Sequence, residues 1–272
     1  MNKIIKTFRS SPFSSIKWDN YFEIYENCLK KFINKKITLV EIGIGNGGSL
    51  FMWRNFLGKK AKIIGIELNP DAKKFEKYGF KIFIGDQSDP LFWKNFYKKN
   101  GKIDVLIDDG GHTNLQQITT LMESIDNIKN NGVILIEDTH TSFMNYKGFK
   151  NPSKNSLINF TTHIIENLHR RNPMLKKKIN NLSKKIFSIE YFDSIVLLNI
   201  KKIINRSKNL HNNIKLNPNF IDYRFKRLGS KKNFAKQNFF TKFIKPKISK
   251  KGFLNSIYEG YLIKKYLRIL KN

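Results

Sequence analysis

Short apolar runs alternate with stretches of helical spacing along the first 140 residues. The apolar runs that we expect to form strands cover residues 37–42, 62–66, 80–84, 103–107 and 133–136. Apolar residues recur at helical spacing between them, over residues 19–33, 50–57, 90–97 and 115–128, and Asn69-Pro70-Asp71 opens a further helix. Strands that alternate with helices predict an α/β fold with a doubly wound, mostly parallel sheet.

Two further apolar runs, residues 185–191 and 194–200, are separated only by Phe192-Asp193. They predict an antiparallel hairpin at one edge, which makes a seven-stranded, Rossmann-like sheet. We therefore expect an N-terminal helical segment over 1–36, one α/β domain over 37–200 and a basic C-terminal extension over 201–272. A polar helical region should follow Asn151 to about Lys178, and helical spacing returns around residues 253–270.

Positive charge is concentrated in the extension. The formal net charge is +30, and residues 201–272 hold twenty Lys or Arg against only two acids. Such an excess attracts nucleic acid, anionic lipid headgroups or acidic glycans. A general richness of the chain in Lys, Asn and Ile accounts for the charge equally well.

The residues that accompany the lysines of the extension indicate which partner it binds. No recognisable nucleic-acid-binding module is present, which disfavours nucleic acid. Aromatic residues among the lysines, such as Phe239, Phe240 and Phe243, favour an anionic membrane surface. Packing on a second subunit, in a homo-oligomer, is the alternative.

The expected location is the cytoplasm. No apolar run approaches the eighteen residues of a membrane-spanning helix, and the first fifteen residues lack the apolar core of a secretory signal. The single cysteine, Cys28, excludes an internal disulfide and any multi-cysteine metal site. The basic extension could hold the protein at the inner membrane surface.

Two acidic clusters follow the fourth and fifth predicted strands: Asp108-Asp109-Gly110-Gly111-His112 and Glu137-Asp138-Thr139-His140. In an open parallel sheet, ligands bind beyond the carboxyl ends of the strands. Four carboxylates and a histidine should therefore converge on one crevice. Like charges in a small space repel unless a cation or protons neutralise them, and hard oxygen ligands favour Mg²⁺, Ca²⁺ or Mn²⁺.

A glycine-rich turn follows the first predicted strand. Gly43, Gly45 and Gly48 form a G-x-G-x-x-G motif, with Gly47 inside it, so that a dinucleotide fold must be considered. Glu67 ends the second strand, where a carboxylate can accept the hydroxyls of a ribose. Gly85-Asp86-Gln87 ends the third strand, where an acid could accept an adenine amino group.

Glu41 discriminates between cofactors. A carboxylate at this place would repel a pyrophosphate but suits an ammonium or a sulfonium, and S-adenosylmethionine carries both. Residues 37–140 resemble class I S-adenosylmethionine-dependent methyltransferases, which makes 37–200 the methyltransferase domain. The resemblance implies that Glu41 and the turn of Gly43, Gly45 and Gly47 hold the methionine portion, Glu67 the ribose, and Asp86 with Gln87 the adenine.

The acidic clusters narrow this resemblance. Asp-Asp-Gly-Gly-His at 108–112, Glu-Asp-Thr-His-Thr-Ser at 137–142 and Gly-Asp-Gln at 85–87 resemble the metal-dependent O-methyltransferases of macrolide sugars, in the wider group of cephalosporin hydroxylase-like proteins. The resemblance implies Mg²⁺ (or Mn²⁺) bound by Asp109, Glu137 and Asp138, with His112 as the base. Gly111 departs from the usual Gly-Ser-His pattern. Asp108 orients the turn or binds cofactor, and His112 has a helix-capping or packing role as its alternative.

Together these features predict a Mg²⁺-dependent O-methyltransferase. Its acceptor would be a sugar hydroxyl of a glycoside, a glycolipid or a surface polysaccharide precursor, and the glycan part rests on resemblance alone. A catechol-type or other small-molecule O-methyltransferase is the alternative. An NAD-dependent oxidoreductase is disfavoured by Glu41 and by the lack of a second mononucleotide-binding half. A nucleic-acid-binding protein that acts through the extension is the least favoured.

Overall fold

The computed structural model describes residues 3–144, 155–169 and 182–201, two residue pairs at 221–222 and 232–233, and six positions between 254 and 264. The chain divides into two compact units, residues 1–206 and 207–272. In the second unit, β8 (Ile221–Asp222) and β9 (Lys232–Asn233) pair antiparallel. The helix expected around 253–270 falls mostly outside the described residues.

A seven-stranded sheet in the order β3-β2-β1-β4-β5-β7-β6 forms the centre of the first unit. The strands β1 to β5 are parallel, whereas β7 runs antiparallel to both β5 and β6. The predicted doubly wound sheet with an antiparallel edge hairpin is thereby confirmed. Its strands are β1 (Thr38–Ile42), β2 (Lys62–Glu67), β3 (Lys81–Ile84), β4 (Ile103–Asp108), β5 (Ile128–Ile136), β6 (Ile186–Phe192) and β7 (Ile195–Ile200).

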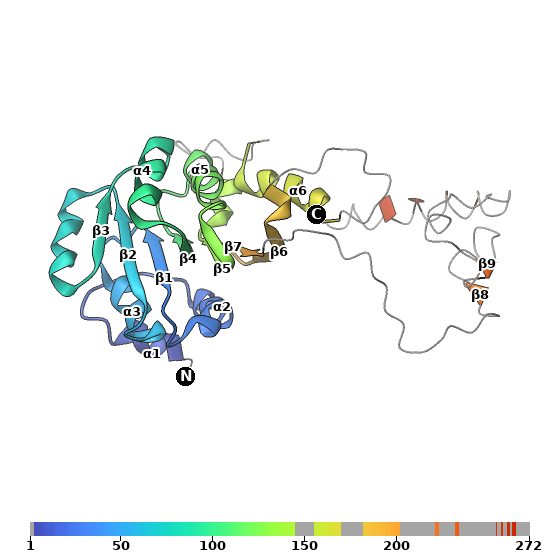
Figure 1. Cartoon of the computed structure of the whole chain (residues 1–272). Helices are drawn as coiled ribbons and strands as arrows, with labels where there is room; N and C mark the ends of the chain where they lie inside the picture. The colour runs from blue at the N-terminus through green and yellow to red at the C-terminus, as the bar shows by residue number, and fades with distance from the viewer. Residues whose placement is uncertain are drawn as a thin grey trace. The chain divides into compact units, whose positions relative to one another are not determined.

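Helices cover both faces of this sheet (Figure 1). On one face lie α1 (Lys3–Arg9), α2 (Asp19–Leu29) and α3 (Gly48–Leu57), and on the other α4 (Pro90–Asn100), α5 (Asn114–Ser124) and α6 (Leu157–Leu168). Short 3-10 helices complete the unit: η1 (Lys30–Phe32), η2 (Pro70–Tyr78), η3 (Thr139–Phe143) and η4 (Leu182–Lys184). Within the described part of the chain, no helix is long and apolar enough to cross a membrane.

Two predicted helices are shorter in the structure. The one expected over 115–128 ends at Ser124, because the chain turns there and Ile128 already pairs with Ile103 at the start of β5. Ile125 and Ile128 are both buried in the same apolar layer, so their spacing imitates a helical face. The helix expected over 19–33 ends at Leu29 and continues as η1. Of the helical region expected up to about Lys178, the described residues contain only α6.

Alternating side chains divide each central strand between the two apolar layers. Leu39 of β1 packs in the layer of α1 to α3, whereas its neighbour Val40 packs in the layer of α4 to α6. Val105 and Leu106 of β4 alternate in the same way. Because successive side chains of a strand point to opposite faces, this alternation also decides which layer each acidic residue at a strand end meets.

Candidate active site at the carboxyl edge of the sheet

The carboxyl ends of the central strands are aligned. Ile42 pairs with Asp108 and Asp108 with Ile136, so that β1, β4 and β5 end at the same level. Backbone bonds extend the ladder by one residue: the N–H of Asp109 donates to Ile42 O at 3.0 Å, and that of Glu137 to Asp108 O at 2.9 Å. The two acidic clusters therefore start side by side.

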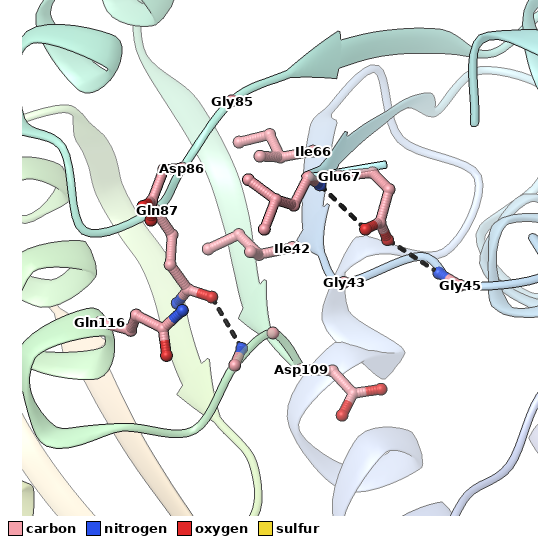
Figure 2. Close-up of a pocket in the computed structure, with 13 residues that line it drawn as sticks. Ile42, Gly43, Gly45, Ile66, Glu67, Gly85, Asp86, Gln87, Asp109 and Gln116 are labelled. Atoms are coloured by element: carbon pink, nitrogen blue, oxygen red, sulfur yellow. Dashed lines mark hydrogen bonds between the residues drawn. The ribbon is translucent and has the colours of Figure 1, made fainter. Parts of the chain in front are cut away.

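A cavity of about 350 Å³ opens at this edge (Figure 2). It contains five of the eight residues predicted to bind the cofactor, together with one predicted metal ligand, Asp109. The lining residues are Ile42, Gly43, Gly45, Ile66, Glu67, Leu68, Gly85, Asp86, Gln87, Asp109, Gly110, Gly111 and Gln116. Sequence reasoning missed the apolar floor of Ile42 and Ile66, because both residues also read as ordinary core of a strand.

Glu67 and Gln87 lie on opposite sides of the cavity, with Ile42 and Ile66 between them (Figure 2). Backbone donors fix the Glu67 carboxylate: Gly45 N–H donates to Oε2 at 3.1 Å and Leu68 N–H to Oε1 at 2.8 Å. Such a fixed carboxylate at the rim can accept hydrogen bonds from the hydroxyls of a ligand.

Of the two residues predicted to bind adenine, Asp86 and Gln87, only Asp86 is exposed. Asp86 is exposed at the rim, where its Oδ1 accepts from both the N–H and the hydroxyl of Ser88 at 2.8 Å. The amide of Gln87 is held on both sides, since Nε2 donates to Asp108 Oδ1 at 2.9 Å and Oε1 accepts from Gly111 N–H at 2.9 Å. Gln87 therefore shapes the cavity wall with an amide that is already paired.

Three predicted cofactor residues lie outside the cavity lining: Glu41, Gly47 and Asp108. Gly47 has a φ of +79° at the start of α3, and a Cβ there would lie 2.5 Å from the ring of Phe75. Asp108 points to the other side, where it is fully buried and bonded to Gln87. Burial raises the pKa of Asp108, against the hydrogen bond from Gln87. Its structural role is to tie the end of β4 to the cavity wall.

Glu41 lies below the glycine turn and is fully buried. The hydroxyl of Ser49 donates to Oε2 at 2.7 Å, and the second oxygen, Oε1, has no hydrogen-bond partner. Burial raises the pKa of Glu41 to about 7, against the nearby ammonium of Lys17 and the Ser49 hydroxyl. A cationic group of a ligand near this carboxylate would favour its ionised form.

Asp109, His112 and Asp138 form a group that could hold a metal ion, with one ligand atom from each within 4.8 Å of the others. His112 Nε2 lies 3.4 Å from Asp138 Oδ2 and 4.0 Å from Asp109 Oδ1. Glu137, the third predicted ligand, is fully buried beside them, and its Oε1 has no hydrogen-bond partner. The structure thus brings Asp109, Glu137, Asp138 and His112 to one place. His112 is close enough to the two aspartates to share an ion with them.

The backbone at this group is strained. His112 has a φ of +57° and Asp138 one of +52°, in the left-handed region that residues other than glycine seldom adopt. Thr141 Oγ1 lies 2.9 Å from the carbonyl oxygens of both residues and links the two loops. Strain of this kind concentrates at functional sites, where the surrounding structure maintains it.

Lys17 occupies the middle of the acidic crevice. Its Nζ lies 2.6 Å from Asp109 Oδ2, 2.9 Å from Glu137 Oε2 and 3.9 Å from Glu41 Oε1, and its side chain is only 1% exposed. Burial opposes the charged form, but the three carboxylates outweigh it and raise the pKa of the ammonium. Burial raises the pKa of Glu137 to about 8 even beside this cation.

The chain has 51 Lys and Arg residues, and no pattern in the sequence distinguishes Lys17 from the rest. Its partners are 92 and 120 residues away along the chain. Only the folded arrangement brings them together. Tyr21, four residues on, was missed for the same reason, although its hydroxyl donates to Asp138 Oδ1 at 2.7 Å.

The segment that carries Lys17 crosses the start of α3. The hydroxyl of Ser11 donates to Gly48 O at 2.9 Å, and Gly48 N–H donates to Ser14 O at 3.2 Å. A Cβ at Gly48 would lie 2.4 Å from Phe13 O, so the crossing requires glycine. The third glycine of the motif thus admits the protein's own chain, and this segment brings Lys17 to the acidic residues of the site.

The sheet order, the antiparallel last pair and the glycine turn after β1 define a Rossmann-like methyltransferase fold. Among solved structures, the MycE methyltransferase from the mycinamycin biosynthetic pathway, in complex with Mg and SAH, matches with a TM-score of 0.65 at 19% identity, over 75% of this chain and 55% of that one. No family model matches the sequence.

Curated relatives carry the names of sugar O-methyltransferases. Two are 27% identical over 165 residues: 8-demethyl-8-alpha-L-rhamnosyl tetracenomycin-C 2'-O-methyltransferase of Streptomyces olivaceus, over 57% of this chain and 43% of that one, and demethylmacrocin O-methyltransferase of Streptomyces fradiae, over 58% and 41%. L-olivosyl-oleandolide 3-O-methyltransferase of Streptomyces antibioticus is 24% identical over 180 residues, 62% of this chain and 46% of that one. The matches span less than half the length of these relatives. They confirm the resemblance that the motifs indicated.

Proposed function

We propose that the protein is a Mg²⁺-dependent O-methyltransferase that transfers the methyl group of S-adenosylmethionine to a sugar hydroxyl. One observation carries this proposal: Asp109 lines the cavity and also belongs to the group with His112 and Asp138. A cofactor in the cavity and an ion at this group would then be neighbours. The names of the relatives support the reaction and the sugar acceptor.

The cavity fits S-adenosylmethionine by the chemistry of its walls. The fixed carboxylate of Glu67 suits the ribose hydroxyls, and exposed Asp86 suits the adenine amino group. Buried Glu41 favours a sulfonium or ammonium near it, and its Oε1 has no hydrogen-bond partner, with Lys17 Nζ 3.9 Å away. The methyl group would then face the acidic crevice.

The acidic group fits a hard divalent ion. Asp109 and Asp138 supply carboxylate oxygens, and Glu137 adds a buried oxygen without a partner, which is the donor set that Mg²⁺ or Mn²⁺ prefers. These three residues would hold the ion. When bound, it supplies Lewis acidity that makes a coordinated hydroxyl easier to deprotonate.

His112 would accept the proton of the acceptor hydroxyl. Its Nε2 lies between the two aspartates, and Tyr21 and Thr141 hold the adjacent Asp138 loop in place. Methyl transfer is an in-line displacement, so the acceptor oxygen must align with the methyl carbon and the sulfur. Positioning of this kind supplies much of the rate of such reactions.

Methyl transfer from labelled S-adenosylmethionine tests the proposal. Acceptors would include rhamnosylated and other deoxysugar glycosides, nucleotide-sugar and polysaccharide fragments, and a catechol, with and without excess EDTA. We expect transfer to a sugar that EDTA abolishes and added Mg²⁺ restores. Calorimetry with S-adenosylmethionine and with NAD tests the cofactor in the same preparation.

A variant pair sharpens this test. Asp138→Asn should lower turnover by about 100-fold or more, because the ion loses a charged ligand. Asp193→Asn, in the exposed turn between β6 and β7, should leave turnover unchanged. Full activity in excess EDTA would contradict the metal, and transfer to the catechol but to no sugar would favour the small-molecule alternative.

A further inference from the structure

We propose that Lys17 is an exchangeable internal cation: its ammonium holds Asp109 and Glu137 until a divalent ion takes these carboxylates, and the Lys17 side chain then leaves the crevice. This inference rests on the proposed function, since it assumes that Asp109 and Glu137 bind the ion. It adds a coupling between metal loading and the N-terminal segment.

The first support is shared residues. Lys17 Nζ contacts Asp109 Oδ2 at 2.6 Å and Glu137 Oε2 at 2.9 Å, and these residues are two of the three proposed metal ligands. Mg²⁺ binds oxygens at about 2.1 Å in near-octahedral geometry and so needs to approach them more closely than an ammonium does. An ion held by the same two carboxylates, including the unpartnered Oε1 of Glu137, competes with the ammonium for their negative charge.

The second support is charge. The Lys17 side chain is 1% exposed, so no water layer screens its ammonium from an ion on the same carboxylates. Repulsion between a single and a double positive charge at contact distance is strong in such a site. The double charge gains more from the carboxylates and should displace the single one.

The third support is how the segment is attached. Phe13 packs against the rings of Phe51 and Phe75 and anchors the start of the segment, and α2 anchors its end. Between these anchors, Ile16 is 92% exposed and Trp18 is 62% exposed, so neither side chain packs into the core. The contacts of Lys17 are thus the main side-chain attachment of residues 15–17, and they can be lost while Trp18 O still accepts from Tyr21 N–H at the start of α2.

Chemical labelling of the wild-type protein tests the exchange directly. Amines are acetylated with a water-soluble reagent, with and without saturating Mg²⁺, and each lysine is followed by peptide mass spectrometry. Mg²⁺ should raise the labelling rate of Lys17 by about tenfold or more, in the range of typical coupling between sites. Lys129, which is 44% exposed and paired with Asp104, is the internal reference and should not change.

A matched pair of variants tests the competition. Lys17→Met should bind Mn²⁺ about tenfold or more tightly by calorimetry, because the competing charge is gone. Lys129→Met removes the same charge from another ion pair and should bind Mn²⁺ as the wild type does. Lys17→Gln replaces the first variant if methionine prevents folding.

The outcomes separate this inference from the proposed function. Bound Mg²⁺ with Lys17 still protected from acetylation would overturn the exchange but leave the metal site intact. Unchanged or weaker Mn²⁺ binding by the Lys17 variants would overturn it as well. Absence of Mn²⁺ and Mg²⁺ binding to every form would contradict the metal site itself, and with it both proposals.

Discussion

His112 combines a reactive side chain with a backbone that only its surroundings maintain. Its φ of +57° costs energy, and Thr141, which touches the carbonyl oxygens of both His112 and Asp138, maintains the geometry. The imidazole lies where both a proton and an ion could be held. Nε2 can therefore act in one of two ways, as the base that accepts a proton or as a ligand of the ion.

Replacing this imidazole separates the two roles. His112→Ala should lower the turnover number by about 10²- to 10⁴-fold, the usual contribution of a general base, with binding of S-adenosylmethionine unchanged. Mn²⁺ affinity should also persist, because the proposed ligands are carboxylates. The exposed His163→Ala is the control. Lost Mn²⁺ binding would instead make His112 a ligand, and normal turnover would remove it from the reaction.

Glu41 predicts how stability depends on pH. Burial raises its pKa from an ordinary value of 4.5 to about 7, so the folded protein holds a proton that the unfolded chain releases between these values. The stability that this proton contributes is complete below about pH 4.5 and is lost as pH rises through about 7. The slope in this window is at most about 1.4 kcal/mol per pH unit.

Urea unfolding from pH 5 to 8 without metal or cofactor measures this slope. Glu41→Gln should lower the slope by at most about 1.4 kcal/mol per pH unit, because the amide does not titrate, whereas Glu137, whose pKa burial raises to about 8, keeps its own contribution. Glu23→Gln, on the exposed side of α2, should leave it as in the wild type. An unchanged slope in Glu41→Gln would show that this carboxyl does not titrate differently on folding.

At the scale of elements, Asp108 joins parts of the fold that the sheet alone does not connect. Gln87, after β3, donates to Asp108 at the end of β4 and also to Thr120 of α5 at 3.1 Å. Asp109, the next residue, faces the cavity instead. Two adjacent aspartates thus serve different purposes because they lie on opposite sides of the chain.

Stability measurements can show this division. Asp108→Ala should lower the free energy of unfolding by about 1 to 3 kcal/mol, since it leaves the buried Gln87 amide without its acceptor. Asp109→Ala removes a partly exposed carboxylate whose partner Lys17 still has Glu137 and Glu41, so it should cost less. Urea denaturation of both variants measures the difference. An equal loss would contradict the anchoring role of Asp108.

The sequence was sufficient for the strands, their order of appearance and the convergence of the acidic clusters. Apolar runs and helical spacing are local, repetitive signals, and their alternation predicts a parallel sheet whose strand ends meet at one edge. It was insufficient for the orientation at the strand ends. Whether Asp108 or Asp109 faces the ligand depends on the pleat, and a shift of one residue reverses it. Lys17 was beyond reach, since a contact over 92 residues leaves no local pattern.

At the scale of the whole molecule, the net charge of the chain is positive, whereas the site is rich in carboxylates. The chain has a net charge of +30, yet the carboxyl edge of its sheet gathers Glu41, Asp109 and Glu137 around one lysine, and Asp138 lies beside His112. The excess positive charge lies mainly in residues 201–272, most of which fall outside the described residues. The basic extension and the site therefore require separate experiments.

A chain that ends at Arg206 tests the extension, since the first compact unit ends there. We expect the full chain to sediment with vesicles that contain phosphatidylserine, and the shortened chain to bind them less, because half of the net positive charge, 15 of 30, is removed. Neutral phosphatidylcholine vesicles are the control. Equal binding of both chains to anionic vesicles would contradict a membrane partner, and a change in oligomeric state on truncation would favour subunit packing.

The carbonyl oxygen of Ser14 already occupies the amino terminus of α3, where Gly48 N–H points at it. In dinucleotide enzymes this place receives the pyrophosphate. Here the protein's own neutral carbonyl accepts from this N–H, so the N–H is not available to a phosphate oxygen of a nucleotide such as NAD. At its third glycine the G-x-G-x-x-G motif therefore serves the crossing of two segments of the chain.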